Sequence, residues 1–399
     1  MQSVYQRKLS INERMFLASA SLSPVANQIV VEGNGTDNLS AWQSAVDAAS
    51  MANPGSRVVL KGSLGLCRWQ DSGISPPVRQ VDGSKWDGKG PEGAPFLDNA
   101  LNAEQGPTCE ILLVKGHPAT GSNTVRVIFR THHAVMDGRG TLFWMEDILR
   151  ALAGLEPIGS NSAITDSQLA RSIQKKFRRP INKKFIAPTG KAIGHEPGVQ
   201  WCRFEIPGPV PQILARSAVI LAKEAWSYKS GPVLFGIPVD LRRHRTDLTS
   251  TANLSYSIYI EVSPGASPGQ IADDIQRQLQ EKREGMLSWE DDLYHFIPLK
   301  LISRQALKII NARHASESYS ISGFLSNLGK IPVERFPDKE FEVHKVWAIP
   351  PSIEYAPFSM VLTGYYDEIS VMLAAPRRLA TGGRLNKAAS HLAQKLGKF

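Results

Sequence analysis

Three titratable side chains lie close together at His132, His133 and Asp137, and Gly138 follows them directly. An imidazole ionises near neutral pH, so a histidine in a loop can take a proton from a bound reactant as a general base. A turn at the glycine can aim the carboxylate of Asp137 back toward the histidines. The same residues also allow a simpler interpretation, in which Asp137 caps the following helix and the histidines run no reaction.

A metal site is another chemistry that histidines and a carboxylate can provide. Adjacent histidines in a loop that enters a helix lack the usual ligand spacing, and no cysteine or carboxylate cluster completes a ligand set. We therefore expect no metal here, which also disfavours a metal-dependent hydrolase.

The loop lies between a predicted strand and a predicted helix. Before it, Val125, Val127 and Phe129 alternate with their neighbours in a run rich in β-branched and aromatic residues, which indicates a strand. From Thr141 onward, apolar residues recur at the spacing of an amphipathic helix. They are Leu142, Met145, Ile148, Leu149 and Leu152. The titratable residues thus occupy a strand-to-helix loop.

Length and composition indicate a globular protein. A chain of 399 residues suits two domains of roughly 150–200 residues each. No apolar run approaches the roughly 20 residues that span a bilayer, and the N-terminal apolar patch, which serines interrupt, is a poor signal peptide. The cysteines, Cys67, Cys109 and Cys202, are odd in number and widely spaced. They favour a reducing cytoplasm over a disulfide framework or a zinc site.

The net charge of +9 suits anionic partners. No basic and aromatic binding motif accompanies it, so we expect no nucleic acid. The positive charge would attract the phosphates of coenzyme A, or an acidic carrier protein, as well as it would attract nucleic acid. The proline-rich segment 161–199 carries part of the charge, including Lys175, Lys176, Arg178 and Arg179. We interpret this segment first as a solvated crossover between domains, and second as a binding surface for phosphates or an acidic carrier.

The periodicity of apolar residues predicts the remaining elements. In the first half we expect strands at 28–32, 57–60 and 109–115, a helix at 39–51, and loops with short strands over 62–95. In the second half we expect strands at 201–206, 233–239, 254–262, 343–349, 359–366 and 368–374. Helices are expected at 210–226, 270–287 and 293–315, and from Leu385 onward.

The histidine loop, HHAVMDG, resembles the HHxxxDG signature of acyltransferases that use coenzyme A or a carrier protein. This group includes the condensation domains of nonribosomal peptide synthetases and chloramphenicol acetyltransferase. Three further likenesses follow in family order: the IPVDLR strand end with Arg242, then Asn253, then Ser326 and Asn327 in the turn SNLG. One departure is RVVL at 57–60, where these families often carry a Leu-Arg pair. The resemblance covers essentially the whole chain.

The resemblance implies a role for each residue of the loop. His133 corresponds to the catalytic base, and His132 to a residue that supports the loop. Asp137 corresponds to a buried carboxylate that pairs with an arginine, and a buried charge does need such a partner. The expected partner is Arg242, with Arg139, Arg243 and Arg245 as competitors.

Three other residues are implied to border the active-site channel. Gly138 allows a tight backbone beside the channel, although a glycine at a helix start has an equally simple explanation. Asn327, preceded by Ser326, can offer its amide to the tetrahedral oxyanion or to the acceptor. An ordinary asparagine in a turn with Gly329 is an equal alternative.

The implied fold is α/β (α+β), with two chloramphenicol acetyltransferase-like domains that form a V-shaped pseudo-dimer around an active-site channel. We place the N-terminal domain with the histidine loop at 1–160, the basic crossover at 161–199 and the C-terminal domain at 200–399. The implied reaction joins a thioester-activated acyl group to an amine or hydroxyl acceptor, with His133 as general base.

Plant-type acyltransferases of this superfamily carry a DFGWG loop, and wax-ester and triacylglycerol synthases carry a Pro-Gly-Pro turn after a Ser-Asn pair. This chain has no DFGWG loop, and Leu328, Gly329 and Lys330 follow its Ser326-Asn327 pair. Both differences favour a stand-alone condensation-type enzyme. Such enzymes serve secondary metabolism of the nonribosomal peptide type, including antibiotic biosynthesis. We expect no tightly bound cofactor; the co-substrate is a phosphopantetheine thioester on a carrier protein or coenzyme A. The alternative is a non-catalytic module of the same fold that docks carrier proteins, and the intact His133 and Asp137 count against it.

Overall fold

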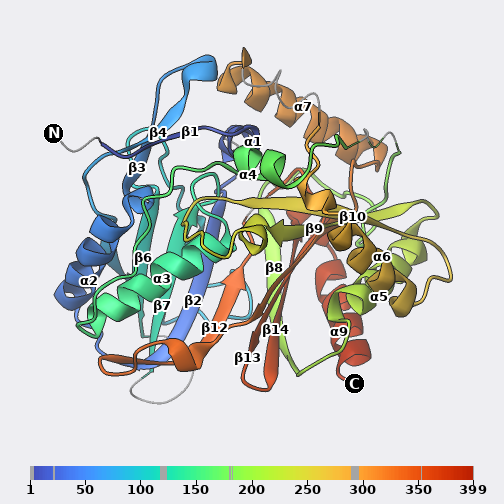
Figure 1. The fold of residues 1–399 in the computed structure, drawn as a ribbon. Helices are drawn as coiled ribbons and strands as arrows, with labels where there is room; N and C mark the ends of the chain where they lie inside the picture. Colours follow the sequence, from blue (N-terminus) through green and yellow to red (C-terminus); the bar gives the residue numbers. More distant parts are fainter. Residues whose placement is uncertain are drawn as a thin grey trace.

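The computed structural model describes residues 4–20, 23–116, 124–178, 181, 183–288, 296–351 and 353–398. Within these ranges the chain forms two α/β halves that lie side by side, each built on a large β-sheet (Figure 1). The sheets face the middle of the molecule, and most helices cover their outer sides. The predicted class, a mixed α/β fold of two similar halves, is confirmed.

The sheet of the first half has the strand order β12-β2-β7-β6-β5. Its strands are β2 (Ala26–Gly35), β5 (Val78–Asp82), β6 (Cys109–Lys115), β7 (Thr124–His132) and β12 (Phe341–Ile349). β6 and β7, which are consecutive along the chain, pair antiparallel. α2 (Leu39–Ala52) and α3 (Gly138–Leu152) pack against each other outside this sheet.

The sheet of the second half has the strand order β10-β9-β11-β13-β14-β8. Its strands are β8 (Val199–Pro207), β9 (Val233–Asp240), β10 (Ser255–Val262), β11 (Gly323–Lys330), β13 (Ser359–Tyr365) and β14 (Glu368–Pro376). The helices of this half are α5 (Ile213–Tyr228), α6 (Pro268–Gln280), α8 (Arg377–Ala380) and α9 (Arg384–Leu396). β11 runs parallel to both of its neighbours, so this sheet is mixed.

A small third sheet and three helices lie at the upper end of the view in Figure 1. The small sheet has the order β1 (Gln6–Lys8), β4 (Arg68–Asp71), β3 (Val58–Lys61). The helices are α1 (Ile11–Ala20), α4 (Asp166–Ile173) and α7 (Leu299–Ser316). α7 packs on α1, where the hydroxyl of Ser303 donates a hydrogen bond of 2.9 Å to the carbonyl of Ala18.

Each half has its own hydrophobic core, and the two cores differ in composition. The first contains five fully buried indole rings, those of Trp42, Trp69, Trp86, Trp144 and Trp347. The second consists mainly of alanine and branched aliphatic side chains. Because a buried indole removes a large apolar area from water, the first core depends on a few large side chains.

β12 links the two halves. It comes from the second half of the chain but pairs antiparallel with β2, with Val346 opposite Val31, and its Trp347 belongs to the first core. One strand of the segment 200–399 therefore lies in the sheet of the first half. The domain boundaries at 160 and 199 stay a prediction.

Several predicted helices have different ends in the structure. α3 begins at Gly138 rather than near Thr141, because Asp137 caps it. The helix expected at 270–287 ends at Gln280, since Lys282 adopts the left-handed φ of 53° that stops a helix. Of the helix expected at 293–315, residues 293–295 lie outside the described residues, and α7 begins at Leu299.

The SNLG segment lies in a strand rather than in a turn. Ser326 and Asn327 pair with Val361 and Leu362 of β13 inside β11. The register shifts between Asn327 and Lys330, where Gly329 has a φ of 75° that glycine adopts without strain. The turn chemistry of the sequence thus produces an irregularity within the strand.

Candidate active site

The histidine loop begins where β7 ends at His132 and closes where α3 begins at Gly138. Its backbone turns tightly, because the N–H groups of Val135 and Met136 both donate to the carbonyl of His132, at 2.7 and 3.1 Å. The loop faces the second half of the molecule. Strand, turn and helix together fix the positions of both histidines and Asp137.

Asp137 is buried, and its carboxylate has four hydrogen-bond donors. As the N-cap of α3 it accepts a bond of 2.7 Å from the backbone N–H of Gly140. Arg242 donates to both carboxylate oxygens, at 3.0 and 3.2 Å, and the backbone N–H of Leu254 donates at 2.8 Å. Asp137 therefore serves as a helix cap and as an ion-pair partner at once.

Arg242 is buried and joins Asp137 to the second half. Its guanidinium also donates to the carbonyl of Ser250 at 3.0 Å, to the carbonyl of Ala252 and to the Asp240 carboxylate at 2.7 Å. Burial alone would lower the pKa of Arg242, but Asp137 and Asp240 outweigh it and hold the pKa above its usual value. The arginine stays charged inside the protein.

Residues 250–254 bring the second half directly onto the histidine loop. The side-chain amide of Asn253 donates to the carbonyl of His133 at 2.7 Å, and its backbone N–H donates to the carbonyl of Val135 at 3.1 Å. The backbone of Thr251 passes so close to Gly140 that any Cβ there would collide with the Thr251 carbonyl. The loop position is thus set by both halves.

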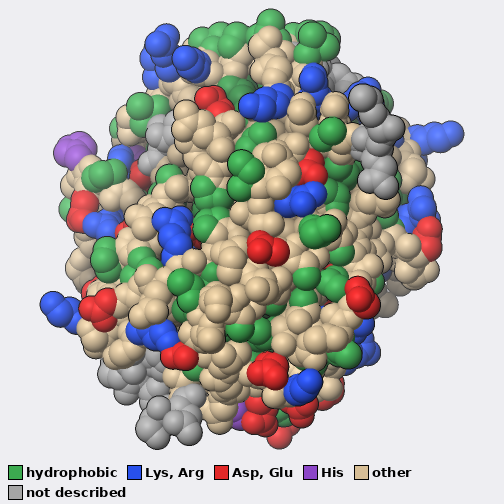
Figure 2. Space-filling model, turned by 90° about the vertical axis from the view of Figure 1, so that its left-hand side faces the viewer, with side chains coloured by type: hydrophobic (Ala, Val, Ile, Leu, Met, Phe, Trp, Pro, Cys, Tyr) green, Lys and Arg blue, Asp and Glu red, His purple; other side chains and the backbone are tan. Residues whose placement is uncertain are grey.

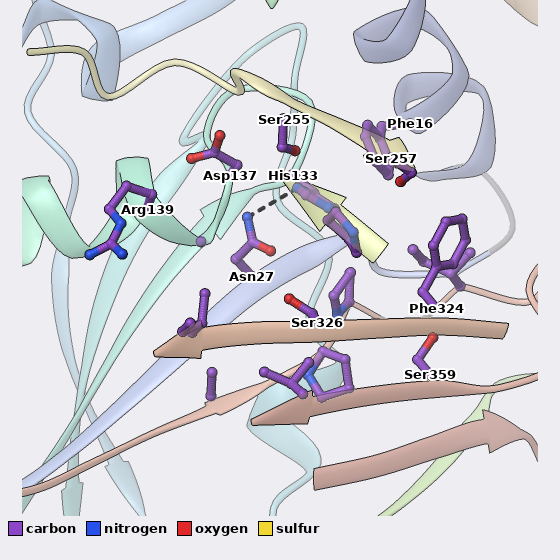
Figure 3. Close-up of a pocket in the computed structure, with 18 of the residues that line it drawn as sticks. Phe16, Asn27, His133, Asp137, Arg139, Ser255, Ser257, Phe324, Ser326 and Ser359 are labelled. Atoms are coloured by element: carbon purple, nitrogen blue, oxygen red, sulfur yellow. Dashed lines mark hydrogen bonds between the residues drawn. The ribbon is translucent and has the colours of Figure 1, made fainter. Parts of the chain in front are cut away.

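His133 is half-buried, and its Nδ1 lies 3.2 Å from the carbonyl oxygen of Met136. The amide of Asn27 donates to the same carbonyl at 2.6 Å. Nδ1 also lies 3.2 Å from the amide nitrogen of Asn27 (Figure 3), so it donates to the Met136 carbonyl in one tautomer and accepts from Asn27 in the other. In the tautomer with the proton on Nδ1, Nε2 keeps its lone pair. The ring of Phe16 lies against the imidazole, with ring centroids 4.1 Å apart.

Burial controls the charge of both histidines. It lowers the pKa of His133, which the Met136 carbonyl and Asp137 oppose only in part. Burial, with His133 nearby, lowers the pKa of His132 to about 4. The Nδ1 of His132 accepts a bond of 3.1 Å from the N–H of Ala134, so His132 is a neutral residue that shapes the loop.

A cavity of about 350 Å³ lies between the two halves at this loop, and both halves line it. His133, Asp137, Gly138, Ser326 and Asn327 all contribute to its wall. Figure 3 shows His133, Asp137 and Ser326 around the cavity. Much of the remaining wall is apolar or carries serine hydroxyls. It includes Met15, Phe16, Ile29, Phe324, Ile349, Pro350, Ile353, Met360, Val361, Ser255, Ser257 and Ser359.

Asn327 lies at the cavity but already has one partner. Its side-chain oxygen accepts a bond of 2.9 Å from the backbone N–H of Gly329. Asn327 therefore bonds to the backbone of Gly329, as an ordinary turn asparagine does, and also lies on the cavity wall. The amide nitrogen of Asn327 is the part left to donate to a reactant.

The four basic residues of the crossover that the sequence analysis names lie in different places. Arg178 lines the cavity, and its guanidinium carbon lies 4.7 Å from the ring centre of Tyr259, which also lines it. Lys175 and Lys176 are exposed and do not line the cavity. Arg179 lies outside the described residues.

Three residues of the site have no counterpart among the sequence-predicted catalytic residues: Asn27, Asn253 and Phe16. Asn253 follows the family order, but no pattern shows that its amide reaches the histidine loop. Asn27 and Phe16 come from β2 and α1, far away in the sequence, and carry no motif. Only the three-dimensional packing reveals them.

Three further observations concern the cysteines, possible metal ligands and the helices of the described residues. There, no group of three His, Cys, Asp or Glu side chains is arranged to hold a metal ion. Cys67, Cys109 and Cys202 are free thiols, and burial raises the pKa of the Cys202 thiol to about 12. Among the described helices, none combines the length and apolar character needed to cross a bilayer.

Comparison with known proteins gives a likeness in structure only. No protein-family model matches the sequence, and no curated protein matches it. A starter condensation domain of rhizomide synthetase in complex with C8-CoA is similar at a TM-score of 0.66 and 15% identity, over 99% of this chain and 95% of that one. A related structure of that domain contains C8-CoA and Leu-SNAC.

Two further solved structures resemble the whole chain. The condensation domain of the monacolin K polyketide synthase has a TM-score of 0.64 at 10% identity, over 100% of this chain and 98% of that one. Polyketide synthase associated protein 5 from Mycobacterium tuberculosis has a TM-score of 0.62 at 14% identity, over 99% and 98%. The chain therefore has the condensation-domain fold, a pseudo-dimer of two chloramphenicol acetyltransferase-like halves.

The buried ion pair of Asp137 and Arg242 should contribute to the free energy of unfolding. Asp137→Ala strands the buried charge of Arg242 and removes a helix cap, so it should lower the free energy of unfolding by about 3–5 kcal/mol. Urea unfolding measures this. Asp240→Asn, which removes a partly exposed carboxylate from the same arginine, should have a smaller effect. Equal losses in the two variants would contradict a special role for the buried pair.

The buried His132 should make the free energy of unfolding depend on pH in the acid range. Its pKa is about 4 in the folded chain and near 6.5 when unfolded, so between these values only the unfolded chain binds the proton. Stability should therefore fall by up to about 3 kcal/mol as the pH drops through this window. His132→Asn should reduce that loss in urea unfolding at about pH 7 and about pH 4.5. The exposed His344→Asn should leave it unchanged; the opposite ranking would contradict the assignment.

Proposed function

We propose that the chain is a condensation-type acyltransferase. It joins a thioester-bound acyl group to an amine or hydroxyl acceptor, with His133 as general base. The observation that carries the proposal is the place of His133, on the wall of a cavity between the two halves, with Nδ1 held by the Met136 carbonyl. We assign the proton to Nδ1, which leaves Nε2 to take a proton from a reactant in the cavity.

The reaction begins as the acceptor N–H or O–H gives its proton to Nε2 of His133. The acceptor lone pair attacks the thioester carbonyl carbon, and the C=O electron pair moves to oxygen. The tetrahedral species then collapses, the C–S bond breaks, and the thiolate recovers the proton from His133. A free thiol and an amide or ester result, so protons and electrons balance.

The environment of His133 suits this task. Because burial lowers its pKa, the imidazole is neutral and able to accept a proton at pH 7. Asp137 points toward Arg242 rather than into a hydrogen bond with the imidazole. It positions the loop and does not act on the substrate. The Asn327 amide and the Ser326 hydroxyl are the donors on the cavity wall that we assign to the oxyanion or the acceptor.

The donor thioester is best sought on a phosphopantetheine arm, of coenzyme A or of a carrier protein. The solved structures with C8-CoA and Leu-SNAC support a thioester donor and an amine acceptor for this fold. Arg178, at the cavity wall beside Tyr259, is the cation that we assign to a phosphate of the donor. We also assign the chain to secondary metabolism of the nonribosomal peptide or polyketide type, which the origin of these neighbours supports.

His133→Ala should keep the fold and lower turnover by about 10²–10⁴-fold, since the cavity loses its proton acceptor. The measurement is thiol release from a panel of acyl-CoA and acyl-carrier donors with amine and alcohol acceptors. His344→Ala, an exposed histidine on β12, is the matched control. Unchanged turnover in folded His133→Ala removes His133 from the mechanism. A wild-type chain that binds carrier protein but releases no thiol favours the non-catalytic docking module.

Arg178→Gln should raise the donor KM by about tenfold, because a charge-assisted contact to phosphate is lost. The effect should shrink at high salt. The double change Lys175→Gln with Lys176→Gln should act less, since both lysines lie outside the cavity wall. Neutralising all four basic residues, Arg179 included, should add little to Arg178→Gln. An unchanged KM in the fourfold variant leaves the segment as a crossover.

A further inference from the structure

α7 buries little of its surface. Only Ile302, Ile310 and His314 of its 18 residues are buried, although a surface helix normally buries an apolar stripe about 100° wide. The opposite face carries Leu301, Arg304 and Lys308, spaced as neighbours on one side of a helix. α7 contains no acidic residue. A basic helix with exposed apolar side chains is typical of helices that lie on lipid surfaces.

The turn between β3 and β4 extends this apolar surface. Leu66 in that turn is 78% exposed, and Phe296, just before α7, is 74% exposed. The guanidinium of Arg14 ties the two segments together, since it donates to the carbonyl of Leu64 at 2.9 Å and to that of Ile297 at 2.5 Å. Figure 1 shows the turn beside the start of α7. The apolar rim consists of Leu64, Leu66, Phe296 and Leu301.

Basic side chains lie next to the apolar rim. Lys8, Lys61 and Arg68 lie side by side across the small sheet, because Arg68 is opposite Lys8 on one neighbour and Lys61 on the other. All three are exposed. Figure 2 shows hydrophobic side chains along the upper edge of this face, with basic side chains nearby. Such a surface complements anionic lipid headgroups.

The cavity wall includes an exposed residue of α1, the helix on which α7 packs. Met15, next to Arg14, is 41% exposed and also lines the cavity. Phe16, the next residue, lines the cavity and packs against His133. An apolar chain that enters from the rim would therefore meet Met15 and Phe16 before it reaches His133.

We propose that the apolar rim and its basic neighbours dock the protein on an anionic lipid surface, and that an apolar reactant enters the cavity from the bilayer past Met15. Docking rests on the surface alone, whereas reactant entry rests on the proposed acyl transfer. The rim residues belong to two separate segments and are highly exposed, which suits insertion among lipids. Single exposed apolar side chains are common on protein surfaces and indicate no partner, whereas a cluster of them does.

Sedimentation of the full chain with lipid vesicles tests the docking. The chain should bind vesicles of phosphatidylcholine with phosphatidylglycerol, and bind phosphatidylcholine alone more weakly. Leu66→Ser combined with Phe296→Ser should weaken binding by about tenfold or more, since two large apolar groups no longer leave water. Changing Lys8, Lys61 and Arg68 to glutamine should weaken it in a salt-sensitive way.

Matched controls distinguish binding by the rim from nonspecific binding by any exposed apolar or basic side chain. Ile74→Ser removes a side chain that is 74% exposed at the other end of the small sheet. Glutamine at the exposed Lys191, Lys223 and Lys395 removes equal charge from the second half. Both controls should bind vesicles as the wild-type chain does. Glutamine or asparagine at Glu290, Asp291 and Asp292, which precede Phe296 in the sequence, should not weaken binding.

The proposal is overturned if the wild-type chain does not sediment with anionic vesicles. It is also overturned if the rim variants and the control variants sediment to the same extent. Rim variants that keep turnover with C8-CoA but lose it with an acyl carrier protein, without any vesicle binding, would show that an acidic protein binds here instead. Because sedimentation needs no turnover, a failure of the proposed acyl transfer does not affect this result. Reactant entry is overturned if anionic vesicles leave the KM of a long-chain reactant unchanged.

Discussion

The buried ion pair between Asp137 and Arg242 is the constraint on which the site depends. Two charges inside a protein are unfavourable unless geometry and further hydrogen bonds satisfy them. Here the carboxylate also accepts from Gly140 and Leu254, and the guanidinium also donates to the carbonyls of residues 250 and 252. Arg242 and the backbone N–H of Leu254 both reach Asp137 from the other half, so the halves have one favourable relative position at this point.

The position of the histidine loop follows from that contact. The same short segment carries Asn253, which holds the backbone of the histidine loop. The loop in turn directs His133 toward the cavity and away from the ion pair. The ion pair of the site thus holds the loop in position, while the imidazole of His133 packs against Phe16. Burial of this kind keeps an imidazole neutral, as the proposed role of His133 as a base requires.

The strand, the loop and the helix around His133 can be predicted from sequence, because their periodicity is local. The partner of Asp137 cannot, since Arg242 is 105 residues away and three other arginines are available. Only the family resemblance selects it. Asn27 is not predictable for a similar reason: its role arises from the pairing of β2 with β7. The basic crossover shows the same limit, because charge alone does not show that Arg178 lines the cavity and Lys175 does not.

β12 has a consequence for how the chain reaches its native state. Val346 pairs with Val31, so the first sheet is completed by a strand that leaves the ribosome long after its neighbour. Until then the edge of β2 is open, and open edges favour pairing with other chains. Contacts between such distant segments also slow folding, because a long loop must close first. The two halves, although alike in architecture, therefore mature as one cooperative unit rather than in succession.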